Sequence, residues 1–202
     1  MCFHSLVSMT DLQLAKHFRV TMENMEELAP QFYINAFTYP KTPVITNLKK
    51  NTLQRYQWGL IPPWAKNDDI KKYTLNAKIE TIEDKVSFKD SIHNRCLILV
   101  NGFYEWQWQD TKGKKKKKFL INVKDELAFA FAGLWSKWID QNSGEIIYSY
   151  TILTTEANEL MSIIHNSKKR MPVIVNPKEY DLWLDGGDIK LESPELEARE
   201  SE

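Results

Sequence analysis

The stretch CLILVNGFYEWQWQD, residues 96–110, carries the strongest strand signature in the chain. Its apolar, β-branched and aromatic residues predict a buried strand, and Asn101–Gly102 predicts an interruption within it. A lysine-rich segment, DTKGKKKKK, follows and leads into FLINV at 119–123. We therefore expect a β-hairpin whose tip carries the lysines.

The segments around this hairpin predict further strands and some short helices. Extended structure is expected at 30–46, at 53–67 with breaks at Gly59 and Pro62–Pro63, at 128–138, at 145–155 and at 171–175. Helices are expected at 11–18, at 79–88, at 156–165 with Thr155 as cap, and at 176–186 with Asn176 as cap. Because strands and helices do not alternate regularly, the pattern indicates an α+β fold with a mostly antiparallel, barrel-like sheet and flanking helices.

Length and charge predict one domain and a tail. The chain has 202 residues, of which 43% are hydrophobic, and its formal net charge is zero. The last eleven residues, ESPELEARESE, hold five Glu and one Arg, so 192–202 is predicted to be an acidic, disordered tail beyond a single domain at 1–191. The chain shows no membrane span or signal peptide, and its two cysteines form no disulfide framework, which favours a soluble intracellular protein.

Several common kinds of site are not indicated. The chain has no CxxC or HExxH motif, its four His are scattered, and its seven Gly form no phosphate-binding loop. We therefore expect neither a metal nor a cofactor.

Four polar residues remain as candidates for chemistry. Cys2 would become the N-terminus if Met1 were removed, and its adjacent amine and thiol would then condense with an aldehyde; a frayed end is the alternative. Glu105 lies in an apolar run and is either a carboxyl of raised pKa or a side chain that points outward. His165 closes a predicted helix, where the charged imidazole would be favoured, and is otherwise a capping or core residue. Asn76 precedes a predicted helix and is either a residue of the site or only the cap of that helix.

Taken together, six stretches resemble the SOS-response-associated peptidase (SRAP) family of abasic-site processing proteins. They are MC at the start, WGLIPPWAK (58–66), NAKIET (76–81), CLILVNGFYEW (96–106), ILTTEAN (152–158) and the pair IH and RMPVIV between 164 and 175. The resemblance covers most of the chain, and the stretches occur in the family's order.

The resemblance implies a cofactor-free, monomeric protein that recognises abasic sites in single-stranded DNA. It further implies a covalent crosslink through Cys2, a lyase-type activity, and a role in DNA repair or the SOS response. Asn76 would lie beside Cys2, and Glu105 and His165 would form the acid/base pair. The family's phosphate contacts would fall on Lys78, Thr154 and Arg170.

The chain departs from the family pattern at three places. Phe3 and His4 replace Gly and Arg, Lys78–Ile79 replaces Arg–Ser, and three extra residues precede Arg170. Two alternative functions stay open. One is a cysteine peptidase that removes its own Met1, and the other is a non-catalytic module that binds single-stranded nucleic acid through lysines and tryptophans.

Overall fold

The Asn101–Gly102 break separates two strands that belong to different sheets. In the computed structural model, which describes residues 2–23 and 29–201, strand β7 (Arg95–Val100) ends before the break and β8 (Gly102–Trp108) begins after it. The backbones pack closely here, because a Cβ on Gly102 would lie 3.0 Å from the carbonyl oxygen of Ile121. The Asn101 amide oxygen accepts hydrogen bonds from the backbone of Ser8 (2.8 Å) and Met9 (3.3 Å), which fixes the change of sheet.

One sheet closes into a barrel. Strand β7 pairs with β4 (Lys41–Thr46) and with β10 (Phe129–Ile139), β4 pairs with β5 (Lys49–Trp58), and β10 pairs with β11 (Ile146–Glu156). The parallel pairing of Tyr150 on β11 with Trp58 on β5 completes the ring. Short strands extend this sheet: β2 (Thr21–Met22), β6 (Asn76–Lys78), β12 (Arg170–Pro172) and β13 (Ile174–Val175).

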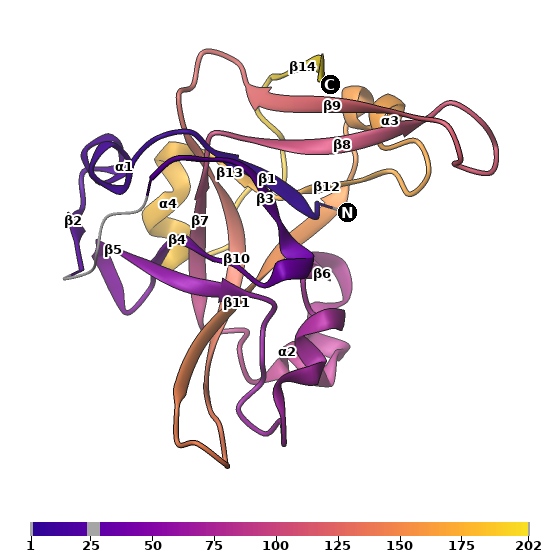
Figure 1. Ribbon diagram of the computed structural model, residues 1–202. Coiled ribbons are helices and arrows are strands. Elements are labelled where there is room, and N and C mark those ends of the chain that lie inside the picture. The colour runs from indigo at the N-terminus through magenta and orange to yellow at the C-terminus, as the bar shows by residue number, and fades with distance from the viewer. Residues whose placement is uncertain (1, 24–28, 202) are drawn as a thin grey trace.

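The other sheet contains five strands and lies beside the barrel (Figure 1). Its order is β14 (Leu196–Ser201), β9 (Lys116–Val123), β8, β1 (His4–Val7) and β3 (Gln31–Asn35), and all its pairings are antiparallel. The first part of the lysine-rich segment forms the loop between β8 and β9, as predicted, whereas Lys116, Lys117 and Lys118 already belong to β9. The α+β, mostly antiparallel and barrel-like fold class is thus confirmed.

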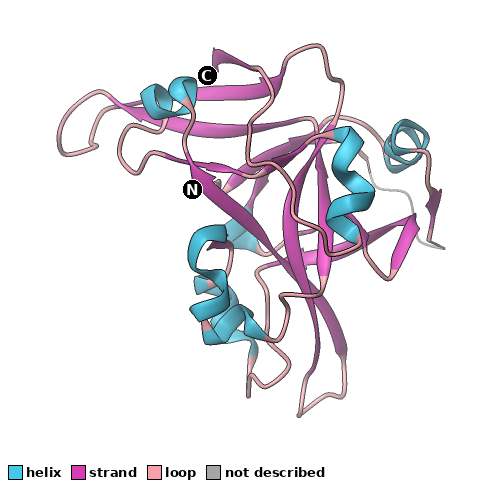
Figure 2. Cartoon of the chain, turned by 180° about the vertical axis from the view of Figure 1, so that it is seen from behind, coloured by secondary structure: helices cyan, strands magenta, loops and turns pink. Residues whose placement is uncertain are grey.

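The helices are short and lie on the outside of the two sheets (Figure 2). They are α1 (Asp11–Phe18), α2 (Val86–Lys89), α3 (Glu159–Ile164), α4 (Tyr180–Leu184) and the 3₁₀ helices Ala36–Thr38, Asp68–Tyr73, Ile79–Asp84 and Pro177–Glu179. The helical structure expected at 79–88 is present as two short helices, the 3₁₀ helix Ile79–Asp84 and α2, which are separated at Lys85. The cap of α3 is Asn158 and not Thr155, because the Asn158 side chain accepts the hydrogen bond from the backbone of Met161. No helix of the described ranges is long and apolar enough to cross a membrane.

The prediction that 192–202 is disordered was wrong for most of this segment. Residues 196–201 form β14, which pairs along its whole length with β9 and is the edge strand of the five-stranded sheet. Leu196 is buried there, while Glu195 and Glu200 form ion pairs with Lys124 and Lys117. The acidic composition therefore complements Lys117 of β9 and Lys124, which follows β9. Strand β14 also satisfies backbone groups that β9 would leave unpaired as an edge strand.

This pairing predicts a measurable contribution of the segment to stability. Leu196→Ala should lower the free energy of unfolding by about 2 kcal/mol, because a buried leucine loses its packing. The exposed neighbour Glu197 is the matched control, and Glu197→Ala should change stability by less than about 0.5 kcal/mol. Urea unfolding of both variants measures the difference. Equal stabilities would mean that β14 is not docked.

Candidate active site around Cys2

Cys2 lies two residues before the start of β1 and is completely buried. Strand β1 runs between β8 and the edge strand β3, so this end of the chain is held on both sides within the five-stranded sheet. The Cys2 thiol contacts the carbonyl oxygen of His4 at 3.6 Å. Burial raises the pKa of this thiol, and the charge of Glu105 raises it further. Cys2 is therefore not a frayed end, and its sulfur is held as a neutral thiol.

Glu105 lies in the middle of β8, opposite Phe119 of β9. Its side chain is buried, and burial raises the pKa of the carboxyl to about 7. The reading in which Glu105 points into solvent is therefore wrong. A carboxyl with this pKa exchanges its proton near neutral pH, as a general acid or base requires.

His165 follows α3 and faces Glu105. Hydrogen bonds join this end of α3 to β8, because Asn166 exchanges two 3.0 Å bonds with the backbone of Trp108. The His165 Nε2 atom then lies 3.9 Å from a Glu105 carboxyl oxygen, and Nδ1 lies 2.7 Å from the carbonyl oxygen of Arg170. A proton on Nδ1 satisfies that carbonyl and leaves Nε2 as an acceptor towards Glu105.

The expectation that the charged form of His165 is favoured was wrong. Burial lowers the pKa of the imidazole to about 4, and the nearby positive charge of Lys168 acts in the same direction. Desolvation thus outweighs the helix C-terminus, which favours the charged form. His165 is neutral at physiological pH.

Asn76 lies on the other side of Cys2. Strand β6 places it by pairing in parallel with β11, and its amide nitrogen donates a 2.9 Å hydrogen bond to the carbonyl oxygen of Cys2. The amide oxygen of Asn76 is buried and accepts no hydrogen bond from the described residues. Asn76 thus holds the backbone of Cys2 through a hydrogen bond and is not a helix cap.

A pocket of about 370 Å³ opens between Glu105 and His165. It is also lined by Phe3, His4, Trp106, Trp108, Lys116, Ser167 and Lys168. A larger hollow of about 830 Å³ lies near Asn101 and Asn122, but none of the four candidates lines it. Within the described ranges, no three His, Cys, Asp or Glu side chains are grouped to hold a metal ion.

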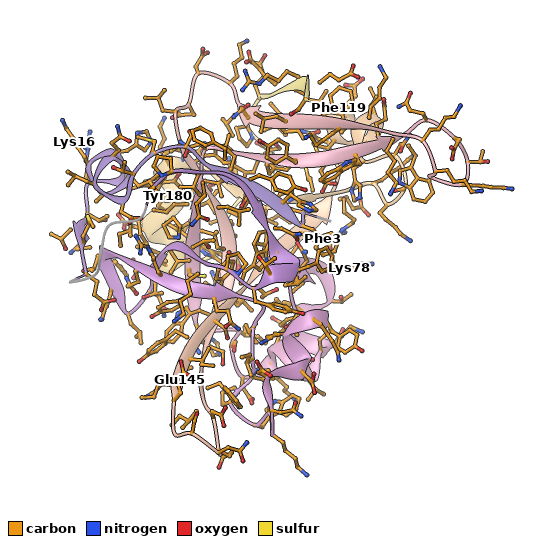
Figure 3. The ribbon with its side chains drawn as sticks, viewed as in Figure 1. Phe3, Lys16, Lys78, Phe119, Glu145 and Tyr180 are labelled. Carbon is orange, nitrogen blue, oxygen red and sulfur yellow. The ribbon has the colours of Figure 1, made fainter. Side chains whose placement is uncertain are left out.

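The three candidate phosphate contacts differ in their exposure. Lys78 is exposed, and in the view of Figure 3 it lies on the same side of the molecule as Phe3. Thr154 is completely buried, and its hydroxyl donates to the carbonyl oxygen of Ala77 at 3.2 Å. The Arg170 guanidinium forms a bidentate pair with Glu80, with distances of 2.8 and 2.9 Å. Of the three, only Lys78 presents its charged group to solvent in this structure.

Sequence reasoning missed two cations beside the pocket. Lys116 and Lys168 belong to basic runs whose pattern is also typical of ordinary solvated loops. For Lys116, the signal in the sequence was the predicted hairpin, because pairing of its two strands places Lys116 opposite Trp108.

A model of the family described as SOS response associated peptidase (SRAP) matches residues 1–199. The chain belongs to this family. The match includes Cys2, Asn76, Glu105 and His165, and it confirms the resemblance seen in the sequence.

The SRAP relatives with curated names are called abasic site processing proteins. YoqW of Bacillus subtilis is 42% identical over 142 residues, which cover 70% of this chain and 61% of the relative. HMCES of Xenopus tropicalis is 32% identical over 177 residues, which cover 73% of this chain and 52% of the relative. The chain thus matches only about half to three fifths of the length of these relatives.

Solved structures share the SRAP fold over almost the whole chain. A protein from Bacteroides thetaiotaomicron has a TM-score of 0.88 with 33% identity and covers 98% of this chain and 91% of its own. A protein from Bordetella bronchiseptica has a TM-score of 0.82 at 24% identity, with both chains covered completely.

Proposed function

We propose that this protein processes abasic sites in single-stranded DNA by forming a thiazolidine crosslink through Cys2. The observation that carries the proposal is the convergence of Asn76, Glu105 and His165 around the buried Cys2, beside a pocket that Glu105 and His165 line. The names of the relatives support abasic sites as the substrate.

The first step is opening of the abasic sugar, which is mostly a cyclic hemiacetal. Glu105, whose raised pKa keeps a protonated population near neutral pH, donates its proton to the ring oxygen as the bond from C1′ to that oxygen breaks. The hydroxyl on C1′ loses its proton to Nε2 of His165 or to water and becomes the aldehyde. No net proton is gained or lost in the sugar.

The second step joins the amine to the aldehyde. Once Met1 is removed, the α-amine of Cys2, with a reference pKa of about 8, attacks C1′ and forms an imine with loss of one water. The buried amide oxygen of Asn76 is an acceptor suited to an amine N–H beside the Cys2 carbonyl that Asn76 already holds.

The third step closes the five-membered ring. The Cys2 sulfur attacks the imine carbon, and the thiol proton ends on the nitrogen. Glu105, ionised after the first step, is the group that transfers this proton. A neutral buried thiol fits this step, because the proton leaves only as the bond forms.

The two alternative functions fit this geometry less well. A thiol peptidase uses a cysteine of lowered pKa beside a protonated histidine. Here burial raises the pKa of the Cys2 thiol, and His165 is neutral. A module that only binds nucleic acid has no use for a buried carboxyl of raised pKa beside a histidine.

A denaturing gel tests the proposal. The protein is incubated with a single-stranded oligonucleotide that carries an abasic site, with the same oligonucleotide after borohydride reduction of that site, and with the undamaged oligonucleotide. A heat-stable, slowly migrating species should form only with the aldehyde. Equal species with the reduced site, or none with any substrate, would contradict the proposal.

We further propose that Lys78 contacts a phosphate near the crosslink. Lys78→Gln should flatten the dependence of log Kd on log salt concentration by about 0.7 for single-stranded DNA, since one phosphate contact is lost. Lys16 on α1 is the matched control, because it is also exposed and lies on the opposite side of the view in Figure 3. Fluorescence anisotropy at several salt concentrations measures the slope. Equal slopes for the two variants would remove Lys78 from the interface.

A further inference from the structure

One face of the five-stranded sheet gathers aromatic rings and lysines from four strands. Alternation along β8 places Tyr104, Trp106 and Trp108 on the same face. The pairing of β8 with β9 and β1 adds Lys118 opposite Trp106, Lys116 opposite Trp108, and His4 opposite Tyr104. Tyr33 of β3 joins them next to His4. We call this set, His4, Tyr33, Tyr104, Trp106, Trp108, Lys116 and Lys118, the aromatic face.

Four rings of the aromatic face, those of Tyr104, Tyr33, His4 and Trp106, contact one another in a continuous row. The His4 ring stacks on Tyr33 with centroids 5.0 Å apart and meets the ring of Trp106 edge-on at 4.6 Å. Tyr33 also contacts Tyr104 at 5.4 Å, yet half of its surface, 51%, remains exposed. Tyr33 therefore has a supported ring that is open to a ligand.

Two lysines accompany the rings. The Lys118 ammonium lies 5.9 Å from the centre of the Tyr33 ring and 5.6 Å from that of Tyr104, and the Lys116 ammonium lies 5.7 Å from that of Trp108. Between them, Lys117 points to the other side of β9 and pairs with Glu200. Among the described residues, neither Lys116 nor Lys118 forms an ion pair with a carboxylate, so their charge is available to an anion.

The aromatic face is continuous with the candidate active site. His4, Trp106, Trp108 and Lys116 line the same pocket as Glu105 and His165. A chain that enters this pocket with one sugar would thus extend its neighbouring nucleotides over the rings.

We propose that the aromatic face binds unpaired bases next to the reacting sugar, with one base stacked on Tyr33. The proposal rests on the proposed function, because that function supplies the single-stranded DNA. Stacking on aromatic rings beside cations is the usual means of binding single strands without sequence preference. A paired duplex does not fit this role, since the faces of its bases are covered by their neighbours. His4, which stands where the family pattern has Arg, thus contributes a ring to this row.

Binding of undamaged DNA tests this proposal independently of the crosslink. Fluorescence anisotropy compares oligothymidine with an oligomer of the same length that has tetrahydrofuran in place of every nucleoside. Tyr33→Ala should weaken binding of oligothymidine by roughly 5- to 150-fold, the scale of one lost stacking contact, and should barely affect the base-free oligomer. Tyr33→Phe should restore binding, because it keeps the ring.

The chain offers a matched control for each part of the aromatic face. Phe32 is adjacent to Tyr33 and more exposed, at 67%, but alternation along β3 points it to the other side. Phe32→Ala should therefore leave oligothymidine binding unchanged. Likewise Lys118→Gln should weaken binding of both oligomers more than Lys117→Gln does.

Equal losses for Tyr33→Ala and Phe32→Ala, or equal losses of Tyr33→Ala on both oligomers, would overturn the proposal. So would unchanged binding of Tyr33→Ala. Failure of the proposed function would be seen differently, as base-dependent binding that persists while no adduct forms with an abasic oligonucleotide.

Discussion

Replacing Cys2 by alanine is expected to abolish the heat-stable adduct with an abasic oligonucleotide. The variant keeps an α-amine and can still form the imine, but it has no sulfur to close the thiazolidine ring. An imine in water hydrolyses, so no covalent species should survive denaturation. Some β-elimination at the abasic site should persist, because that reaction needs only the amine.

Cys96→Ala is the control for this variant. Cys96 is the other cysteine of the chain and is also completely buried, but it lies on β7 in the barrel core. Folding of both variants is checked by thermal unfolding, and the adduct is measured on a denaturing gel. Wild-type yields of adduct from Cys2→Ala, or loss of adduct from a folded Cys96→Ala, would refute the role of Cys2.

Glu105→Gln is expected to slow crosslinking to an abasic site by roughly 10²-fold or more, the usual scale of general acid–base catalysis. Glutamine keeps the shape of the side chain and its hydrogen bonds but cannot transfer a proton. A simple open-chain aldehyde needs no ring opening, so its reaction should slow much less. Equal slowing of both aldehydes would exclude ring opening as the role of Glu105, and no slowing of either would make it a structural carboxyl.

The pH dependence of the wild-type reaction follows from the same carboxyl. Its pKa of about 7 means that the protonated acid is lost as the pH rises above neutrality. The α-amine, with a reference pKa of about 8, is lost as a nucleophile as the pH falls. The rate of crosslinking should therefore pass through a maximum between these values, and Glu105→Gln should remove the decline on the alkaline side.

Stability gives a second readout for Glu105. In the unfolded chain a Glu carboxyl titrates near 4.3, whereas in the folded protein this one titrates at about 7. Between these values the folded state holds a proton that the unfolded chain has released, so the free energy of unfolding falls as pH rises through this window. Glu105→Gln removes this loss and should gain stability relative to wild type from pH 4 to pH 7. Urea unfolding of the wild type and of Glu105→Gln at pH 4 and at pH 7 measures this gain.

Local patterns in the sequence predict the hairpin and the strands but not the closure of the barrel. Asn101–Gly102 is visible as a break because both residues favour irregular backbone, and the structure makes it the point where the chain changes sheet. The closure depends on Tyr150 pairing with Trp58, residues far apart in the chain. The periodicity of apolar residues within a segment does not indicate which distant segment it pairs with. The docking of β14 was missed for a related reason, since its partner lysines lie on β9.

The site shows the same limit at the level of single residues. Alternation along a strand distinguishes a buried from an exposed face only where one face of the sheet meets water. Glu105 lies where α3 and the start of the chain cover the five-stranded sheet, so alternation does not show whether its side chain is buried. Its burial therefore required the structure. The charge state of His165 likewise depends on desolvation, which the helix position does not reveal. The bidentate pair of Arg170 with Glu80 joins two segments that the sequence keeps ninety residues apart.

Mass spectrometry of the crosslinked protein tests the central claim most directly. The protein is incubated with a short abasic oligonucleotide, and the intact mass is measured before and after digestion. We predict a species that lacks Met1 and whose mass equals the summed masses of protein and oligonucleotide less one water. After digestion, the modification should lie on a peptide that begins at Cys2. Selective acylation of the α-amine, with the thiol left free, should prevent its formation. An adduct that retains Met1, or that forms on the acylated protein, would contradict the thiazolidine mechanism.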